Sequence, residues 1–247
     1  MAAIRVQRII QQAGLGSRRQ AEAWIEAGRV TVDGRKAQLG DQVDPEQHQI
    51  AVDGQPVTLR SAPLAYLVLY KPRGYTTSMK DRHAEHLITE LIPRKFGRLF
   101  PVGRLDKESE GLIILTNDGV LAHALMHPSH GVKKVYDVWV KGIPKKSHLE
   151  RMRQGVVLED GPSTPDAVDL IARREGRALI RVVLHEGKKR EIRRIFDSIG
   201  HSVDELIRVR YANIGLDNLE PGQFRPSPGP ESRALTGYGS SSKGSSK

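Results

Sequence analysis

The stretch GRLDKESEGLIILTNDG, residues 103–119, places one carboxylate just before an unbroken apolar run. The run GLIILT, residues 111–116, is too apolar for a strand that faces water on both sides, which predicts a largely buried strand. Asp106 then lies at the edge of that strand, where clefts form. Taken alone, the segment also allows a plain structural interpretation, in which a turn aspartate pairs with Arg104 or Lys107.

The chain on either side of this stretch mixes apolar strands with short helical segments. This mixture predicts an α+β domain with a mixed, largely antiparallel sheet flanked by helices. The predicted strands are YLVLY (66–70), GLIILT (111–116), KVYDVWVKG (134–142), ALIRVVLHEG (178–187) and IRVRYANI (207–214), and the predicted helices are DGVLAHALMH (118–127) and KREIRRIFDSIG (189–200).

Two of these neighbouring segments carry polar groups that suit a cleft. LYKPRGYTT puts Lys71 between a strand and a turn, where the plain interpretation is simply the turn. KKVYDVWVKG alternates so that Tyr136 shares one face with Val138 and Val140. That face places the phenol either in a cleft or in the core.

The segment HEGKKREIRRIFDSIG, residues 185–200, combines a helical core stripe with a row of arginines. Cations grouped near a helix start are typical of an anion site. The expected core stripe is Ile192, Ile195, Phe196 and Ile199, and the arginines beside it are Arg190, Arg193 and Arg194.

Residues 1–60 are predicted to form a separate unit of two helices and two hairpins. A three-to-four residue apolar spacing predicts a short helix over Arg5–Gly14. Ser17 and Gln20 form a capping-box pattern that begins a second helix, which ends at Gly28. Tight hairpin turns are expected at Asp33-Gly34 and Asp53-Gly54, and a linker is expected over Ser61 to Pro63.

The composition is that of a basic protein without disulfides. The 247 residues carry a formal net charge of +10 and no cysteine, which excludes disulfides, thiolate metal sites and a cysteine nucleophile. The excess of Lys and Arg fits a polyanionic partner, although charge for solubility is the plain alternative. No stretch is long and apolar enough to span a bilayer, so we expect a cytoplasmic protein. Residues 232–247, rich in Gly, Ser and Lys, are expected to form a disordered tail.

The N-terminal unit resembles the S4 RNA-binding domain. The resemblance rests on GLGSRRQAEAWIEAGRVTVDGRKAQLGDQV, residues 14–43, with its helix pair and glycine-punctuated hairpin. Arginine pairs well with phosphate, so the charges alone point the same way. The residues that the resemblance places near RNA are Arg18, Arg19, Arg29, Arg35 and Lys36.

The motifs YKPRG, VGRLDKESEGLIILTNDG, LMHPS, KKVYDVWVKG, LEDG and EGKKREIRRIF resemble, in order and spacing, the RsuA/RluB-type ribosomal RNA pseudouridine synthases. The resemblance covers residues 1–231 and implies a catalytic domain over residues 61–231. GVVLEDGP and GKKREIRR are closer to the branch that acts on large-subunit (23S) RNA than to the small-subunit enzyme. Residues 78–96, SMKDRHAEHLITELIPRKF, depart from the pattern and are a candidate for target choice.

The resemblance implies an enzyme that isomerises a uridine within ribosomal RNA to its C-glycoside, after flipping the base out of the structured RNA. Such a reaction needs no cofactor or metal, in keeping with a sequence that has no P-loop or dinucleotide motif. The implied partner is ribosomal RNA, free or in a partly assembled subunit, and a monomer is the default. Attack on the ribose and attack on the uracil ring both stay open.

The resemblance also assigns roles to individual residues. Asp106 is the catalytic carboxylate, Arg193 pairs with it, and Tyr136 stacks against the uracil and moves a proton. The pocket residues are Leu105 and Ile192, and the residues expected to hold RNA phosphates in this domain are Arg104, Lys71, Arg190 and Arg194.

Two functions of other kinds are alternatives. A non-catalytic RNA-binding or ribosome-assembly protein would satisfy the basic charge but leaves the matched acid and tyrosine unexplained. A base-removing hydrolase would also use an aspartate and a flipped base, and it would release free uracil. His123 and His127 have a spacing that suits one metal, but with Asp118 as the only nearby acid we expect RNA contact or helix packing there.

Overall fold

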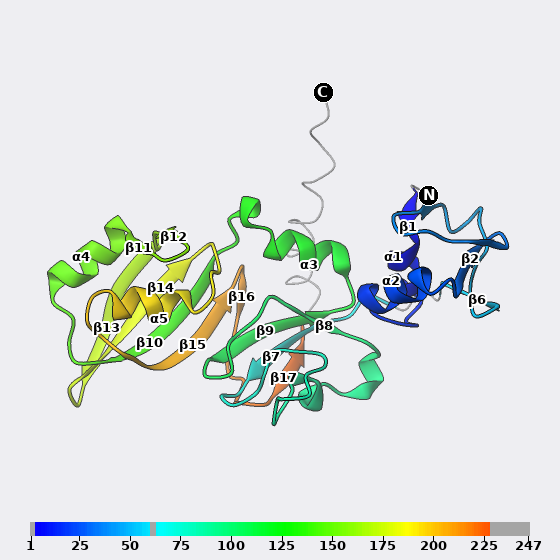
Figure 1. Ribbon diagram of the computed structural model, residues 1–247. Helices are drawn as coiled ribbons and strands as arrows, with labels where there is room; N and C mark the ends of the chain where they lie inside the picture. The colour runs from blue at the N-terminus through cyan, green and yellow to red at the C-terminus, as the bar shows by residue number, and fades with distance from the viewer. Residues whose placement is uncertain (1–2, 60–62, 228–247) are drawn as a thin grey trace. The chain divides into compact units, whose positions relative to one another are not determined.

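The computed structural model describes residues 3–59 and 63–227, and the chain divides into two compact units, Met1–Pro63 and Leu64–Lys247 (Figure 1). The division falls at the proline-bearing joint, of which residues 61 and 62 lie outside the described residues. The predicted tail, residues 232–247, also lies outside them. No helix in the described ranges is long and apolar enough to cross a membrane.

The N-terminal unit packs two helices against small hairpins, as predicted. Ser17 caps the second helix by accepting a hydrogen bond from the backbone N–H of Gln20 at 3.2 Å. Asp33 and Gly34 both have positive φ, 48° and 80°, which is the geometry of a two-residue type I′ hairpin turn. The elements are β1 Ile4–Arg5, α1 Val6–Gln12, α2 Arg18–Glu26, β2 Val30–Val32, β3 Arg35–Lys36, β4 Gln42–Val43, β5 Ile50–Val52 and β6 Gln55–Pro56.

The second unit is built on one long mixed sheet with the order β13-β14-β10-β15-β9-β7-β17. All its strand pairs are antiparallel except β15 with β9, so the α+β prediction is confirmed. The strands are β7 Tyr66–Lys71, β8 Phe100–Val102, β9 Glu110–Thr116, β10 Lys134–Lys141, β13 Ala167–Arg174, β14 Arg177–Leu184, β15 Val203–Tyr211, β16 Ile214–Gly215 and β17 Phe224–Pro226, and a separate hairpin is formed by β11 Val156–Leu158 and β12 Gly161–Ser163.

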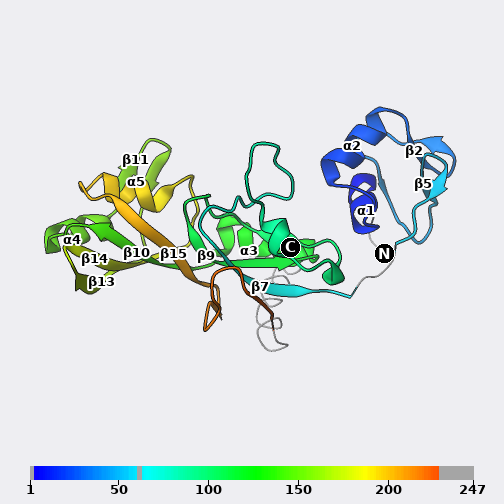
Figure 2. The ribbon, with the colours of Figure 1, turned by 90° about the horizontal axis from the view of Figure 1, so that it is seen from below.

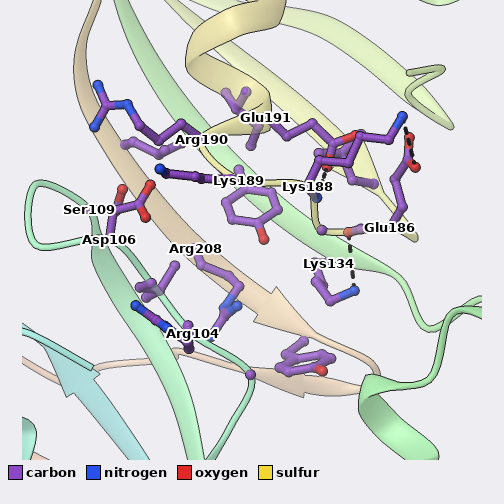
Figure 3. Close-up of a pocket in the computed structure, with 18 of the residues that line it drawn as sticks. Arg104, Asp106, Ser109, Lys134, Glu186, Lys188, Lys189, Arg190, Glu191 and Arg208 are labelled. Atoms are coloured by element: carbon purple, nitrogen blue, oxygen red, sulfur yellow. Dashed lines mark hydrogen bonds and ion pairs between the residues drawn. The ribbon is translucent and has the colours of Figure 1, made fainter. Parts of the chain in front are cut away.

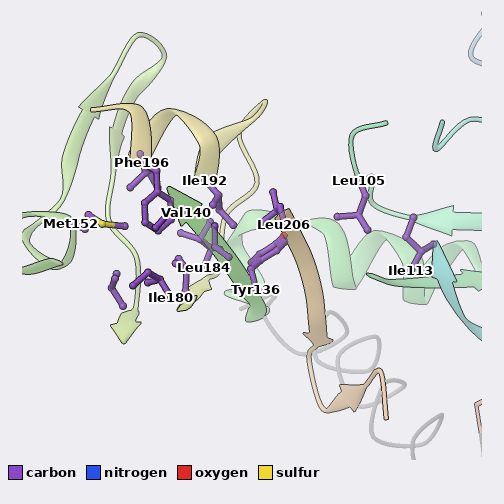
Figure 4. Close-up of a cluster of buried hydrophobic side chains, with 14 of the residues drawn as sticks. Leu105, Ile113, Tyr136, Val140, Met152, Ile180, Leu184, Ile192, Phe196 and Leu206 are labelled. Carbon is purple, nitrogen blue, oxygen red and sulfur yellow. The ribbon is translucent and has the colours of Figure 1, made fainter. Parts of the chain in front are cut away.

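Helices cover parts of both faces of this sheet, which explains why β9 is apolar from Gly111 to Leu115. Ile113, labelled in Figure 4, and Leu115 join the larger core cluster on one face. Leu112 and Ile114 join a second cluster with α3 on the other face. The helices are α3 Gly119–Met126, α4 Lys146–Gln154 and α5 Glu191–Asp197, and single 3-10 turns occur at η1 Ile88–Leu91, η2 Arg94–Phe96 and η3 Pro128–His130.

The predicted core faces are confirmed. Tyr136, Val138 and Val140 are all buried on one face of β10, and Ile192 and Phe196 are buried on α5. The hairpin β11–β12 lies beside α5 in both Figure 1 and Figure 2.

Among the described strands of this sheet, the one parallel pair joins β15 to β9 through two residue pairs, Ile207 with Glu110 and Arg208 with Gly111. In the antiparallel pair on the other side of β15, Arg208 lies opposite Tyr136. Tyr136, Arg208 and Gly111 therefore form a row across three strands. The turn that carries Asp106 enters β9 at this row, so the sheet itself brings the Asp106 segment close to Tyr136.

Candidate active site

Asp106 lies in the turn between β8 and β9, residues 103–109, and its side chain is half-buried. The Asp106 carbonyl accepts a hydrogen bond from the Ser109 backbone N–H at 3.0 Å, which closes the turn. Asp106 is not paired with Lys107, as the plain interpretation allowed, because Lys107 donates to Glu85 at 2.8 Å. Arg104 is exposed and makes no ion pair within the described ranges.

The segment after β7, residues 72–77, is hydrogen-bonded to this turn. The Thr77 hydroxyl donates to the Leu105 carbonyl at 2.7 Å and accepts from the Leu105 backbone N–H at 3.2 Å. The backbone N–H of Gly74 donates to the Lys107 carbonyl at 2.8 Å. Both peptide groups of Leu105 are thus fixed immediately before Asp106. Thr77 belongs to the segment LYKPRGYTT, whose pattern alone does not indicate this role.

Lys71 does not lie where the predicted phosphate contact requires. It is fully buried, and its ammonium group donates to the carbonyls of Ser109 at 2.6 Å and Pro72 at 2.9 Å. Burial lowers the pKa of Lys71 to about 8, opposed by the nearby carboxylates of Glu110 and Asp106. The prediction that Lys71 clamps an RNA phosphate therefore does not fit its place: Lys71 ties the end of β7 to the Asp106 turn.

The partners of Arg193 also differ from the predicted one, Asp106. Its guanidinium donates to the carbonyls of Glu108 at 3.1 Å and Val203 at 3.2 Å, and no ion pair with Asp106 occurs among the described residues. Burial lowers the pKa of Arg193, and the charge of nearby Arg190 adds to this, whereas the Asp106 carboxylate opposes it. Arg193 thus fixes the backbone of the turn and acts on Asp106 through the field between them rather than through a direct fork.

A pocket of about 780 Å³ lies between this turn, β10, β15 and the start of α5 (Figure 3). Tyr136 lines it, with 8% of its surface exposed, and Leu105 and Ile192 line it as expected. Figure 3 shows Asp106 on one side of the pocket and Glu186 and Lys188 on the other. The carboxylate, the phenol and the two apolar side chains therefore share one cavity.

The floor of the pocket contains two cations and a tyrosine to which the sequence pattern assigns no site role. Arg208 is 2% exposed, donates to the Leu112 carbonyl at 2.7 Å, and stacks over the Tyr211 ring at 5.0 Å. Lys134 donates to the carbonyls of His185 and Glu186, and burial lowers its pKa to about 8. The floor is consequently positive, whereas the pattern of IRVRYANI predicts only a strand.

The arginines around α5 separate into different roles. Arg190 is exposed and lines the pocket, as its predicted role requires. Arg194 instead makes a two-bond ion pair with Asp160, at 2.8 and 2.9 Å. The RNA contact expected of Arg194 stays a prediction, and a phosphate there would compete with Asp160, which pairs with both ends of the guanidinium. Lys188 and Lys189 also line the pocket; the motif GKKR contained them.

The N-terminal unit exposes most of its expected RNA contacts. Arg18 and Arg19, at the start of α2, are exposed, as are Arg35 and Lys36 in β3. Arg29 is exposed too, but it forms a two-bond ion pair with Asp53. The charge of Arg29 is therefore partly neutralised, whereas Arg18 and Arg19 make no ion pair in the described part of the chain.

His123 and His127 lie side by side on the surface, with ring centroids 5.3 Å apart. No group of three or more His, Cys, Asp or Glu side chains that could hold a metal occurs in residues 3–59 and 63–227. Asp118 instead caps α3 by accepting from the backbone N–H groups of Val120 and Leu121 at 3.0 Å.

The site combines a carboxylate, a buried phenol and several cations around one cavity wide enough for a base and its sugar. A positive pocket attracts phosphate groups. These are the requirements for chemistry on a nucleotide of a polyanionic substrate.

Comparison with known proteins agrees with a site for chemistry on a polyanionic nucleic acid. A family model described as RNA pseudouridylate synthase matches residues 65–198, and the S4 domain model matches residues 4–48. An uncharacterized RNA pseudouridine synthase of Mycobacterium tuberculosis is 43% identical over 226 residues, 90% of this chain and 89% of the relative. The ribosomal large subunit pseudouridine synthase B of Bacillus subtilis is 39% identical over 224 residues, 90% and 91%. A crystal structure of a pseudouridylate synthase matches with a TM-score of 0.68 at 25% identity, covering 94% of this chain and 99% of the other.

Proposed function

The chain belongs to the RNA pseudouridylate synthase family, and on that premise we propose that it isomerises a specific uridine of large-subunit ribosomal RNA, with Asp106 as the catalytic carboxylate. The observation that carries the catalytic role is the place of Asp106: half-buried, on the wall of a positive pocket that also holds Tyr136. The target class rests on the Bacillus subtilis relative, whose name specifies the large ribosomal subunit.

The reaction breaks the bond from the ribose C1′ to N1 of uracil and forms one from C1′ to C5. The proton on C5 leaves and N1 gains one, so no atom is gained or lost overall. Asp106 must be ionised to act as a nucleophile or to assist departure of the base. Lys71, which is buried, and Arg193, which is partly buried, place positive charge near the Asp106 carboxylate, and Arg208 lies on the floor of the same pocket.

A uridine in structured RNA has to leave its stack to reach a pocket of this kind. In the proposed complex the flipped base lies against Tyr136 and above the apolar side chains of Leu105 and Ile192. Arg104 and Arg190 are exposed at the pocket and hold the flanking phosphates. The N-terminal unit adds phosphate contacts through Arg18 and Arg19.

Mapping of pseudouridine tests the proposal. Large- and small-subunit ribosomal RNA transcripts are incubated with the protein, derivatised chemically, and read by primer extension. We expect one new stop on the large-subunit RNA. A stop on the small-subunit RNA alone would reverse the proposed target, and tight binding of both RNAs without any stop would favour a binding protein. Free uracil in place of pseudouridine would favour a base-removing hydrolase.

A further inference from the structure

The segment between β14 and α5, His185–Arg190, is hereafter the cationic loop. Lys189 and Arg190 are exposed on this loop, line the pocket, and make no ion pair within residues 63–227. Arg190 has a φ of 51°, in the left-handed region that a side chain other than glycine adopts only when its surroundings hold it there. Contacts from α5, from the β11–β12 hairpin and from β10 hold this loop in place.

Glu191, the first residue of α5, provides one of these contacts. Only 4% of Glu191 is exposed, and burial raises the pKa of its carboxyl. One carboxyl oxygen accepts from the hydroxyl of Ser163 at 2.6 Å, and the other accepts from the backbone N–H of Lys188 at 3.0 Å. A buried carboxyl group is costly unless it is hydrogen-bonded, so these two bonds define where the loop can lie.

The hairpin β11–β12 supplies the rest of the support. The Lys188 ammonium donates to the carbonyls of Pro162 and, at 3.4 Å, Gly161. Ser163, fully buried in the same hairpin, donates to Glu191. With the Asp160–Arg194 ion pair, the hairpin contacts the loop and α5 through four successive residues, 160–163.

Contacts from the other side complete the frame. Lys134 on β10 donates to the carbonyls of His185 at 3.2 Å and Glu186 at 3.3 Å. The His185 ring lies 2.8 Å from a carboxylate oxygen of Asp166. The loop is therefore held through its backbone and through the side chains of His185, Glu186 and Lys188, of which Glu186 lies 3.5 Å from the Lys188 ammonium. Lys189 and Arg190 stay available at the pocket (Figure 3).

We propose that Glu191 is a positioning residue: anchored by Ser163, it fixes the cationic loop so that Lys189 and Arg190 meet the phosphates that flank the target nucleotide. This inference rests on the proposed function for the identity of the polyanion. A charged side chain held in place binds phosphate better than one that must be ordered on binding. The contribution of Glu191 to RNA affinity therefore passes through the two cations.

A double-mutant cycle on RNA affinity tests this route. The variants are Glu191→Ala, the pair Lys189→Met with Arg190→Met, and all three together, with filter binding to an in vitro transcript of large-subunit ribosomal RNA. We expect Glu191→Ala to weaken binding about tenfold, and the triple variant to bind within about twofold of the Lys189/Arg190 pair. An additive triple variant, or an unchanged Glu191→Ala, would overturn the proposal.

Two further variants separate positioning from general destabilisation. Glu191→Gln can still accept from the Lys188 N–H and donate to Ser163, so we expect affinity within about threefold of the wild type. Ile195→Val, buried in the same helix, loosens the core and should leave affinity unchanged. If Glu191→Ala fails to fold, Ser163→Ala replaces it in the cycle, with the same non-additivity expected.

The readout keeps this inference apart from the proposed function. Binding is measured without product formation, so a wild-type protein that binds RNA but forms no pseudouridine would overturn the isomerase assignment and leave the cycle interpretable. A normal yield of pseudouridine together with an additive cycle would overturn only the role of Glu191.

Discussion

Gly111 lies directly against the backbone of Arg208, so that a Cβ atom on Gly111 would come within 2.4 Å of the Arg208 carbonyl oxygen. This close approach joins β9 to β15, and it is the point at which the Asp106 turn and the strand opposite Tyr136 meet. Gly111 also has a φ of 102°, which a residue with a side chain adopts only under strain. One glycine thus allows both halves of the sheet to form a single pocket.

Substitution of Gly111 by alanine should therefore be severe. We expect a loss of at least about 3 kcal/mol in the free energy of unfolding, because backbone strain and a contact with rigid backbone add together. Urea unfolding followed by circular dichroism measures it. Gly176→Ala is the matched control: Gly176 also has positive φ, 73°, but nothing lies within 4 Å of its added Cβ. Equal losses for the two variants would contradict the close-approach argument.

Thr77 should affect turnover more than RNA binding. Thr77→Val keeps the shape but leaves the N–H and carbonyl of Leu105 without their partner, at a cost of about 2 kcal/mol. Because Asp106 follows directly, we expect kcat to fall at least about tenfold while RNA affinity changes less than about threefold.

Single-turnover pseudouridine formation, with binding measured separately, checks the Thr77 prediction. Thr116→Val is the control: Thr116 is also buried and its hydroxyl accepts the Asp118 N–H at 2.9 Å, but at the far end of β9. The prediction is wrong if Thr116→Val lowers kcat as much as Thr77→Val does.

The free energy of unfolding should first rise and then fall as the pH increases through the alkaline range. Burial lowers the pKa of Lys134 from 10.5 to about 8, so between these values the unfolded chain binds a proton that the folded chain does not. The free energy of unfolding therefore increases with pH in this window. Burial raises the pKa of Tyr66 from 10.0 to about 12, so above pH 10 the folded chain keeps a proton that the unfolded chain loses, and stability decreases.

Urea unfolding at intervals across the alkaline range checks this. Lys134→Met should show a shallower rise than the wild type, and Tyr66→Phe a shallower fall. Lys71, whose pKa is also about 8, keeps part of the rise in Lys134→Met. A wild-type profile parallel to both variants would show that neither group titrates differently in the folded chain.

Arginines of the N-terminal unit should differ in their contribution to salt dependence. Replacing Arg18 and Arg19 by alanine should reduce the slope of log K against log salt concentration by about 1 to 2, because each lost phosphate contact removes a little less than one unit. Arg29→Ala should change the slope less, since Asp53 already pairs with Arg29. RNA titrations at several salt concentrations measure these slopes, and a larger effect for Arg29 would contradict the assignment.

Features with local causes could be predicted from the sequence. The Asp33-Gly34 turn and the Ser17 cap depend on a few adjacent residues, and both form as predicted. The α5 core stripe follows from periodicity alone, and Ile192 and Phe196 are buried accordingly.

Features with distant causes could not be predicted in this way. Lys71 is buried because its ammonium reaches the Ser109 carbonyl, 38 residues further along the chain. Arg194 turns from the pocket because Asp160 of another hairpin meets it. Periodicity places a side chain on a face of its own helix or strand, but the partner on that face depends on the tertiary fold.

The role of Asp106 is tested most directly by Asp106→Asn, which keeps the shape of the side chain and removes its charge. Glu108→Gln, two residues along the same turn, is the control. The measurement is pseudouridine mapping on large-subunit ribosomal RNA, with RNA affinity determined in parallel. We expect the stop with wild type and Glu108→Gln and none with Asp106→Asn, whose affinity stays within about threefold of the wild type. Pseudouridine formed by Asp106→Asn at the wild-type rate would contradict the account.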